Sequence, residues 1–507
     1  MTDARITSQA ISLTPLSPLH IGCGEDYEPT NYVIHQNVLY SFDPAVVPLD
    51  AALRKEFLAA VRSGSIPSVV KFFQRNADTF RVFAENALPV CGQCVKTHRL
   101  MAEKGEGRNQ NKIARTTYCA TNEGNAYYLP GSALKGVIHT ALLNRVNAGA
   151  PRDIKDDLDK KILGGTFSDS PMRFLKVADL LQTKPVPSRI VMARRCYKGD
   201  GQALDRQGGI PAPFEILERG AVRPFRGSLS LTPPNAEQRA AHVYGSAEEI
   251  FRDLNAYYAP ILKKEIEKYA RISEGRAWSN ALSQLLRKLE KDIRQNRVAV
   301  IRIGKNVGAE SIVLQGGIAS IHKIKGKNTA TTEWRVMNGL ETLPFGWCLL
   351  ECSDDPVREA VKTFCAKQPD TPVIDLTNLF EERKARMEEA RRKEAEEEIH
   401  RQEETKKRLL AEEAARADDV RRSQLSLEQL HLEDLVKKLK AVSGDVKPGS
   451  EPYNEVWSFL QTALSWSADL QIEVARELAP VAKAKNMYQG KKAKELKAIF
   501  RTLRQEN

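Results

Sequence analysis

Two glycine-bearing segments near the start of the sequence have the composition of sites that hold phosphate groups. The first is His20-Ile21-Gly22-Cys23-Gly24, where an apolar, strand-like segment runs into a turn with two glycines. Glycine lets a backbone approach a ligand closely, and the N–H groups of such a turn can hold an anion. We therefore expect His20, Gly22 and Gly24 to contact a phosphate backbone.

The second segment, Pro130-Gly131-Ser132-Ala133-Leu134-Lys135, is typical of a turn followed by a helix start. Ser132 is predicted to be the N-cap, and Lys135 lies in the first turn. Free N–H groups at a helix start, with a lysine beside them, form an anion site. Gly131, Ser132 and Lys135 are the expected contacts, although an ordinary capped helix with a solvated lysine explains the same residues.

Basic residues in three further segments extend this pattern. Residues 300–308 predict a strand that ends in a basic, glycine-bearing loop without the spacing of a nucleotide-binding P-loop. Residues 194–199 and 223–226 mix arginine and lysine with aromatic residues, as an RNA surface or as the edges of hairpins. The expected contacts in these segments are Arg302, Gly304, Lys305 and Asn306, together with Arg195 and Lys198.

A zinc site is left open by the cysteine pattern. Cys91 and Cys94 have the spacing of a zinc knuckle, and His98 and Cys119 are two further potential ligands. The second half of the set is not a paired motif, as it usually is in a zinc ribbon. We expect neither a metal nor another cofactor, and we expect the eight cysteines to be free thiols.

The charge distribution indicates a polyanionic partner for the larger part of the chain. The 507 residues carry a net charge of +12, and counting lysine, arginine, aspartate and glutamate assigns +11 of it to residues 1–376. A basic globular region favours nucleic acid, although plain solubility explains the charge as well. No apolar run approaches the roughly 18 residues of a membrane span, and the start does not resemble a signal peptide, so we expect a cytoplasmic protein.

The elements that must position these residues predict an α+β core. Strands are expected at 6–13, 32–42 (a hairpin turning at Gln36-Asn37), 173–232, 298–303 and 346–351. Helices are expected at 50–83 and in a charged insertion or lobe at about 236–296, and a loop at 100–125. The predicted domains are a core at 1–376, a charged helical spacer at 377–440 and a small basic helical domain at 441–507.

The spacer is predicted from repeated glutamate-to-base pairs four residues apart, which stabilise an isolated helix. Its few apolar residues hold no heptad, so we expect a solvated single helix that is polar on all sides, with a coiled coil as the alternative. Ser426-Leu427-Glu428-Gln429 predicts a capping box that opens a further helix.

In this order and at these distances, the motifs resemble those of the RAMP superfamily of CRISPR proteins. Residues 19–22 (Leu-His-Ile-Gly) are similar to the family's opening strand and turn, and residues 129–136 (Leu-Pro-Gly-Ser-Ala-Leu-Lys-Gly) to its characteristic helix start. Residues 163–179, 302–308 and 343–347 resemble its later segments. The pattern is most similar to the Csm-five family of type III-A complexes over about residues 5–352, and the tail from about 377 departs from it.

The resemblance implies an RRM/ferredoxin-like RAMP core that grips RNA through its backbone and leaves sequence reading to base pairing. It implies a non-catalytic crRNA-binding and assembly subunit that caps the backbone near the crRNA 3′ end of a type III effector ribonucleoprotein in antiviral defence. The expected partners are crRNA, target RNA through it, and the Cas-seven-like backbone and small subunits, with no membrane. The first alternative is a RAMP endoribonuclease that processes crRNA or cuts target RNA with His20 or Asp26. A second alternative, unrelated to the family, is an RNA adaptor that carries a coiled coil. Thr30 and Asn31 stand near the position of the catalytic aspartate in related subunits, and neither is a general base.

Overall fold

The computed structural model describes most of the chain and divides it into two compact units, Met1–Glu389 and Ala390–Asn507. The described residues are 6–104, 112–121, 124–150, 159–163, 169–197, 211–234, 241–315, 332–337, 340–490 and 492–505. No helix within these ranges has an apolar stretch long enough to cross a membrane.

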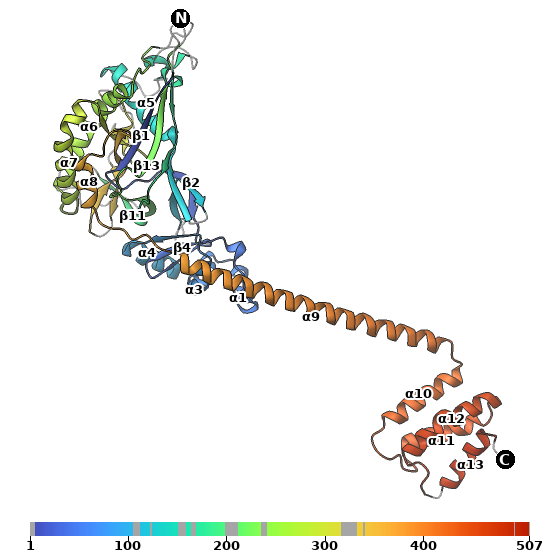
Figure 1. The fold of residues 1–507 in the computed structure, drawn as a ribbon. Helices are drawn as coiled ribbons and strands as arrows, with labels where there is room; N and C mark the ends of the chain where they lie inside the picture. The colour runs from blue at the N-terminus through green and yellow to red at the C-terminus, as the bar shows by residue number, and fades with distance from the viewer. Residues whose placement is uncertain are drawn as a thin grey trace. The chain divides into compact units, whose positions relative to one another are not determined.

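An antiparallel sheet of eight strands forms the centre of the first unit (Figure 1). Its path is β14-β17-β1-β13-β10-β8-β7, and β9 pairs with β13. Alternation in β1 places Ile11 and Leu13 in the core, where both are fully buried. The strands are β1 (Thr7–Pro15), β7 (Tyr118–Thr121), β8 (Gly124–Leu129), β9 (Leu175–Val177), β10 (Leu180–Gln182), β13 (Phe225–Leu231), β14 (Val298–Arg302) and β17 (Trp347–Cys352).

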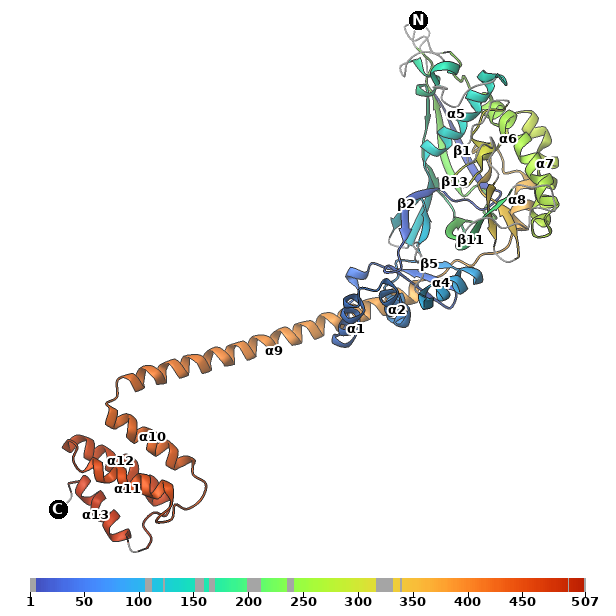
Figure 2. The ribbon, with the colours of Figure 1, turned by 180° about the vertical axis from the view of Figure 1, so that it is seen from behind.

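Helices α6 (Ala247–Ala270), α7 (Arg276–Arg294) and α8 (Glu359–Ala366) gather on one side of this sheet (Figures 1 and 2). α5 (Gly131–Asn147) packs along α6. The apolar residues of α6 and α7 lie in the same hydrophobic cluster as β1, β14 and β17. The predicted helical insertion at 236–296 is therefore part of the central core and not a separate lobe.

A second sheet of six strands has the order β16-β15-β11-β12-β6-β2. It contains β6, and β7 of the first sheet follows directly. The prediction of a loop at 100–125 is therefore wrong for residues 113–121, and also for 100–104, which end a helix, and for 124–125, which begin β8. Isoleucine, threonine and tyrosine favour strands at 113–121, and the glycines and asparagines that suggested a loop stand at 105–111, outside the described residues. The strands are β2 (Gly22–Tyr27), β6 (Ile113–Thr116), β11 (Ser188–Tyr197), β12 (Ala212–Leu217), β15 (Thr332–Met337) and β16 (Thr342–Pro344).

The predicted hairpin is confirmed as β3 (Tyr32–His35) and β4 (Val38–Ser41), and β5 (Asn86–Pro89) completes a three-stranded sheet. Gln36 and Asn37 both have positive φ, 49° and 61°, as a tight two-residue hairpin turn requires. Beside this sheet lie the four helices α1 (Ala51–Arg62), α2 (Ile66–Arg75), α3 (Ala77–Phe80) and α4 (Gly92–Lys104).

The long charged helix is α9 (Thr377–Ser423), and its first turns belong to the first unit. Leu379 and Met387 pack against a cluster of phenylalanines from α2, α3 and their neighbours, next to which the start of α9 lies in Figures 1 and 2. The expectation of a helix that is polar on all sides is therefore wrong for this end. The sequence pattern missed the contact because Leu379 and Met387, eight positions apart, suffice once a hydrophobic surface formed by other elements faces them.

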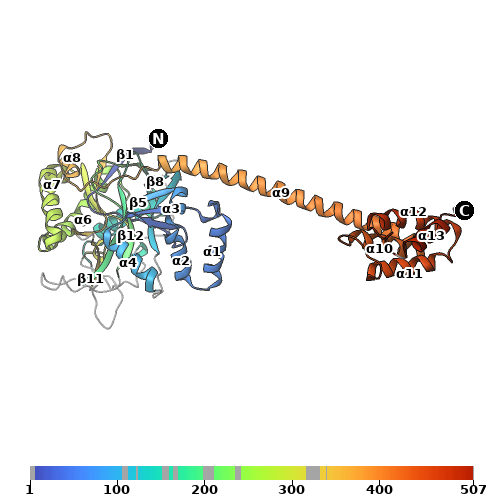
Figure 3. The same cartoon turned by 90° about the horizontal axis from the view of Figure 1, so that it is seen from below.

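The second unit contains a bundle of four helices (Figure 3). Ser426 and Gln429 form the predicted capping box at the start of α10. Leu432, Leu435 and Leu439 of α10 share one core with the other three helices, so α10 belongs to the bundle, whereas we had assigned it to the spacer. The helices are α10 (Leu427–Ala441), α11 (Glu451–Ala463), α12 (Ala468–Ala484) and α13 (Ala493–Leu503).

Candidate nucleic-acid interface

The first glycine motif and the 302–308 loop lie against each other although they are far apart in the sequence. The Lys305 backbone N–H donates to the His20 carbonyl, with 2.8 Å between N and O. Gly304 has φ +102°, and a Cβ there would lie 2.5 Å from the same oxygen. Only glycine fits this contact, because a side chain would meet both the backbone strain and the carbonyl.

The 343–347 segment contacts both the residues before the first glycine motif and the end of β14. The Gly346 N–H donates to the Pro18 carbonyl at 2.9 Å, and the Ile303 N–H donates to the Gly346 carbonyl at 2.9 Å. Gly346 has φ +84°, and a Cβ there would lie 2.3 Å from the Ile303 oxygen. Three segments that we identified separately therefore form one structure around the end of β14.

The exposed part of this structure is the start of β2 with the Lys305 side chain beside it. Gly22 and Gly24 are exposed, and β2 is an edge strand whose pairing with β6 shifts register between Gly22 and Asp26. Edge strands and bulges leave backbone N–H groups free for a ligand. Lys305 is exposed and, among the described residues, has no carboxylate at ion-pair distance. A phosphate group can therefore meet backbone donors and an unpaired ammonium group together.

Asn306 follows in the left-handed region with φ +68° and is partly buried. Its Nδ2 is a buried atom without a hydrogen-bond partner among the described residues. Such a donor is costly to leave unpaired, and it lies next to the exposed lysine. Asn306 remains a candidate contact on this ground.

His20 itself is fully buried, so the predicted side-chain contact with RNA is wrong. Its Nδ1–H donates to the Glu215 carbonyl at 2.7 Å, and its ring meets the edge of Phe214. Burial lowers the pKa of His20 to about 4 despite this hydrogen bond, which acts in the opposite direction. The imidazole is therefore neutral near pH 7, and its Nε2 is a buried atom without a hydrogen-bond partner among the described residues.

Glu215, which sequence reasoning missed, organises the interior behind this turn. Its carboxylate accepts from the Tyr127 hydroxyl at 2.9 Å, the Tyr27 hydroxyl at 3.3 Å and the Thr116 N–H at 3.0 Å. Complete burial raises its pKa, and the hydrogen bonds act against that rise. The sequence does contain a signal for this residue, because Glu215 is the one charged residue in the otherwise apolar strand 212–217. Through Tyr127 the network connects β2 with β8, which leads into α5.

The start of α5 differs from the prediction. Pro130 is the N-cap, not Ser132, and the Gly131 N–H donates to the Asp179 carboxylate at 2.7 Å. A Cβ at Gly131 would lie 2.2 Å from the Val177 carbonyl oxygen, so this glycine allows close packing and does not face RNA. The protein's own carboxylate thus takes the first N–H of the predicted anion site. Ser132 remains exposed and Lys135 half-exposed, with a pKa lowered by partial burial.

Arg302 is also buried, and the prediction that it contacts RNA is wrong. Its guanidinium bonds to the Glu265 carboxylate at 2.6 Å and to the Phe345 carbonyl at 2.9 Å. Three residues further on, Lys305 faces solvent. Arg302 is the last residue of β14, and its side chain lies in the core. Lys305 lies on the loop that follows, and its side chain is exposed.

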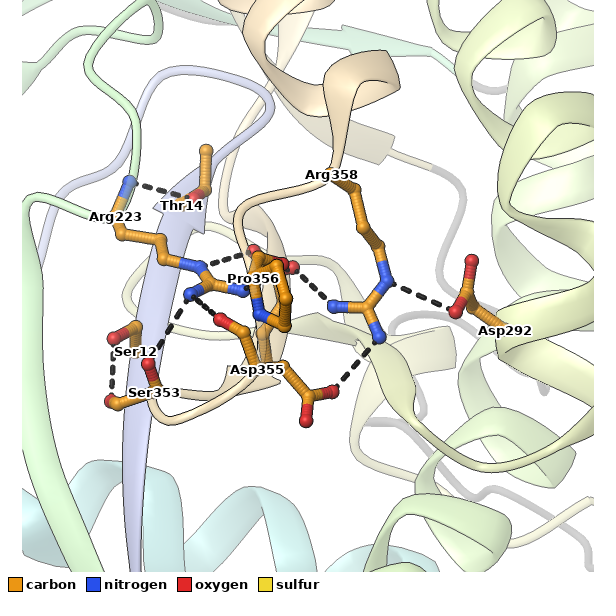
Figure 4. Close-up of polar contacts among 9 residues, drawn as sticks. Ser12, Thr14, Arg223, Asp292, Ser353, Asp355, Pro356 and Arg358 are labelled. Carbon is orange, nitrogen blue, oxygen red and sulfur yellow. Dashed lines mark hydrogen bonds and ion pairs between the residues drawn. The ribbon is translucent and has the colours of Figure 1, made fainter.

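Arg223, in the second basic-aromatic segment, likewise faces inward (Figure 4). It bonds to the fully buried Glu351 at 2.9 Å and to the Asp355 carbonyl at 2.7 Å. Arg358 shares Glu351 at 2.9 Å and pairs with Asp292 at 3.1 Å (Figure 4). This network joins β1, β17 and α7, so it stabilises the fold and offers no free cation at Arg223.

Arg195 is exposed on β11, 6.0 Å from the centre of the Trp334 ring on the neighbouring strand. Cation and ring therefore stand side by side, as expected of a surface that binds single-stranded nucleic acid. Lys198 lies outside the described residues.

The four potential zinc ligands do not assemble. Cys91 and Cys94 are in contact, but Cys119 is exposed on β7 and the His98 ring packs against Tyr32. Within the described ranges, no three histidine, cysteine, aspartate or glutamate side chains are grouped so that they could hold a metal ion. Asp26 is exposed on β2.

The mixed α/β core and these motifs resemble those of the RAMP superfamily, and the sequence comparison agrees with this resemblance. The family description "RAMP superfamily" matches residues 12–308, more than half of the chain, and the chain belongs to this family. The predicted α+β class, with an RRM/ferredoxin-like RAMP core followed by a long charged helix and an all-α domain, is confirmed.

Within the superfamily the chain is similar to Csm5. The CRISPR system Cms protein Csm5 of Methanocaldococcus jannaschii is 24% identical over 182 residues, which are 33% of this chain and 41% of that protein. A chain of the cryo-EM Csm–crRNA–target RNA ternary complex of a type III-A CRISPR-Cas system aligns with 68% of this chain and 100% of its own length, with a TM-score of 0.44 and 16% identity. The crystal structure of T. onnurineus Csm5 aligns with 67% and 99%, with a TM-score of 0.40 and 16% identity.

Proposed function

We propose that this protein is a non-catalytic crRNA-binding and assembly subunit of a type III CRISPR effector ribonucleoprotein. Membership of the RAMP superfamily and the partial similarity to Csm5 support this proposal. Its partners are crRNA, target RNA paired with it, and the Cas-seven-like backbone and small subunits. By the same similarity it caps the backbone near the 3′ end of the crRNA.

The observation that carries the proposal is the contact between the 20–24 turn and the 304–306 loop. It places the exposed glycines of edge strand β2 beside the exposed Lys305 ammonium, which has no carboxylate at ion-pair distance among the described residues. Contacts of this kind hold the sugar-phosphate backbone and carry no sequence information. They suit a subunit that holds a guide whose sequence differs from one complex to the next. The excess of positive charge within residues 1–376 also favours binding of RNA, which is a polyanion.

Replacing Lys305 with alanine tests this interface directly. One lost phosphate contact should reduce the slope of log affinity against log salt by about 0.7 for single-stranded RNA, with several-fold weaker binding at low salt. Fluorescence anisotropy with the full chain and a labelled single-stranded RNA measures both. The matched control is Lys288→Ala, which removes an exposed lysine from α7. Equal effects of the two substitutions, with both proteins folded, would refute the interface.

Catalytic silence is tested with the same RNA and Asp26→Asn. We expect the wild-type chain and the variant to leave RNA equally intact with and without divalent metal, and gel electrophoresis of labelled RNA measures this. A metal-dependent cleavage that is lost in Asp26→Asn would replace the proposed function with the endoribonuclease alternative.

A further inference from the structure

Cys91 and Cys94 form a contact that the proposed function does not use. The two Sγ atoms are 3.2 Å apart, and the Cys94 backbone N–H donates to Cys91 Sγ at 3.4 Å. Cys91 directly precedes α4, and its carbonyl accepts from the Val95 N–H at 3.2 Å. The pair therefore has the Cys-x-x-Cys arrangement in which the first sulfur stands at a helix start and the second lies one turn inside.

The two thiols differ in access. Cys91 is partly exposed, and the neighbouring Gly92 has open space around its Cα, whereas Cys94 is 5% exposed within an apolar cluster. The hydrogen bond with Cys94, together with backbone N–H groups, lowers the pKa of Cys91 to about 6, and the same contact with burial raises that of Cys94. A partly exposed cysteine with a lowered pKa, in contact with a buried thiol, is the arrangement of a reactive cysteine and its resolving partner.

We propose that Cys91 and Cys94 are a reversible dithiol–disulfide site that reacts with low-molecular-weight disulfides such as oxidised glutathione. The Cys91 thiolate attacks one sulfur of the oxidant, forms a mixed disulfide and releases one glutathione thiolate. The Cys94 sulfur, on losing its proton to that thiolate or to solvent, attacks Cys91 and releases the second glutathione. The protein loses two hydrogens, and one oxidised glutathione becomes two reduced molecules.

The second step is favoured because Cys94 already touches the sulfur that it must attack, so the step is intramolecular and needs little rearrangement. The site is attached to the fold through β11, since the Cys91 N–H donates to the Ile190 carbonyl at 2.9 Å. The proposal depends on the contact between the Cys91 and Cys94 sulfur atoms and is independent of RNA binding.

Peptide mass spectrometry of the full chain tests the proposal. The protein is equilibrated with reduced and oxidised glutathione, quenched with acid and alkylated. We expect a Cys91–Cys94 disulfide that dithiothreitol reverses. In Cys94→Ala, the same treatment should leave a stable glutathionyl group on Cys91, and in Cys91→Ala no disulfide should form. The exposed Cys23 is an internal control, because its Sγ contacts the Arg115 carbonyl and not a second sulfur, so it should carry glutathione only.

Two results would overturn the proposal. The first is wild-type protein in which Cys23 acquires glutathione while Cys91 and Cys94 remain thiols. The second is zinc that copurifies in stoichiometric amount and protects both cysteines until a chelator removes it, which would make the pair a metal site. Both are read from wild-type protein, so they stand even where an alanine variant fails to fold.

Discussion

Gly304→Ala should destabilise the first unit and separate the two loops of the candidate interface. An alanine with φ near +102° costs about 1–3 kcal/mol in backbone strain. Its Cβ would also stand 2.5 Å from the His20 carbonyl oxygen, so the loops must part. Losing the Lys305–His20 hydrogen bond then costs about 1 kcal/mol more. The total is roughly 2–4 kcal/mol, a large part of the stability of an ordinary domain.

Gly24→Ala is the matched control, because φ there is +88° but nothing lies within 4 Å of the added Cβ. It should cost only the left-handed strain, about 1–2 kcal/mol. Hydrogen exchange of the full chain, followed by mass spectrometry of peptides from β14 and β17, compares the two locally. A difference of about 2 kcal/mol corresponds to roughly thirtyfold faster exchange in Gly304→Ala. If both variants exchange equally fast, the close approach of the two loops is refuted.

Three further predictions follow from the buried charges and from α9. Arg302→Met should cost up to about 3–5 kcal/mol in unfolding free energy, because it leaves the buried Glu265 carboxylate with only the 3.5 Å contact to Lys268. Lys305→Ala should change the unfolding free energy by less than about 0.5 kcal/mol; denaturant titration measures both, and equal losses would contradict the assignment. Because the folded pKa of His20, about 4, lies below its unfolded value of 6.5, its stabilisation is complete above pH 6.5 and falls by about 3 kcal/mol as the pH drops towards 4. His20→Gln should lack this component of acid sensitivity in unfolding followed against pH, and an unchanged profile would refute it. A chain that ends at residue 389 should be more stable to heat than one that ends at 376, because only the longer one keeps Leu379 and Met387 on the phenylalanine cluster; equal melting temperatures would show that this contact is negligible.

Local spacing determined those parts of the fold whose cause is local. The hairpin turn at Gln36-Asn37, the capping box at Ser426 and the long charged helix all depend on residues within a few positions of one another. The three interface motifs could be identified for the same reason. Each consists of glycines at fixed positions next to a strand or a helix start, within a short run of consecutive residues. The family resemblance rested on the same consecutive residues, and the comparison confirms it.

Tertiary structure alone decided which of the candidate residues face solvent. Arg302 and Lys305 are three residues apart and equally basic, yet only Arg302 finds a buried carboxylate, from Glu265 on α6, 37 positions away. His20 is removed from the surface by β12 in the same way. A charge or an imidazole is buried only where a distant partner compensates its desolvation, and no local pattern records where that partner will lie.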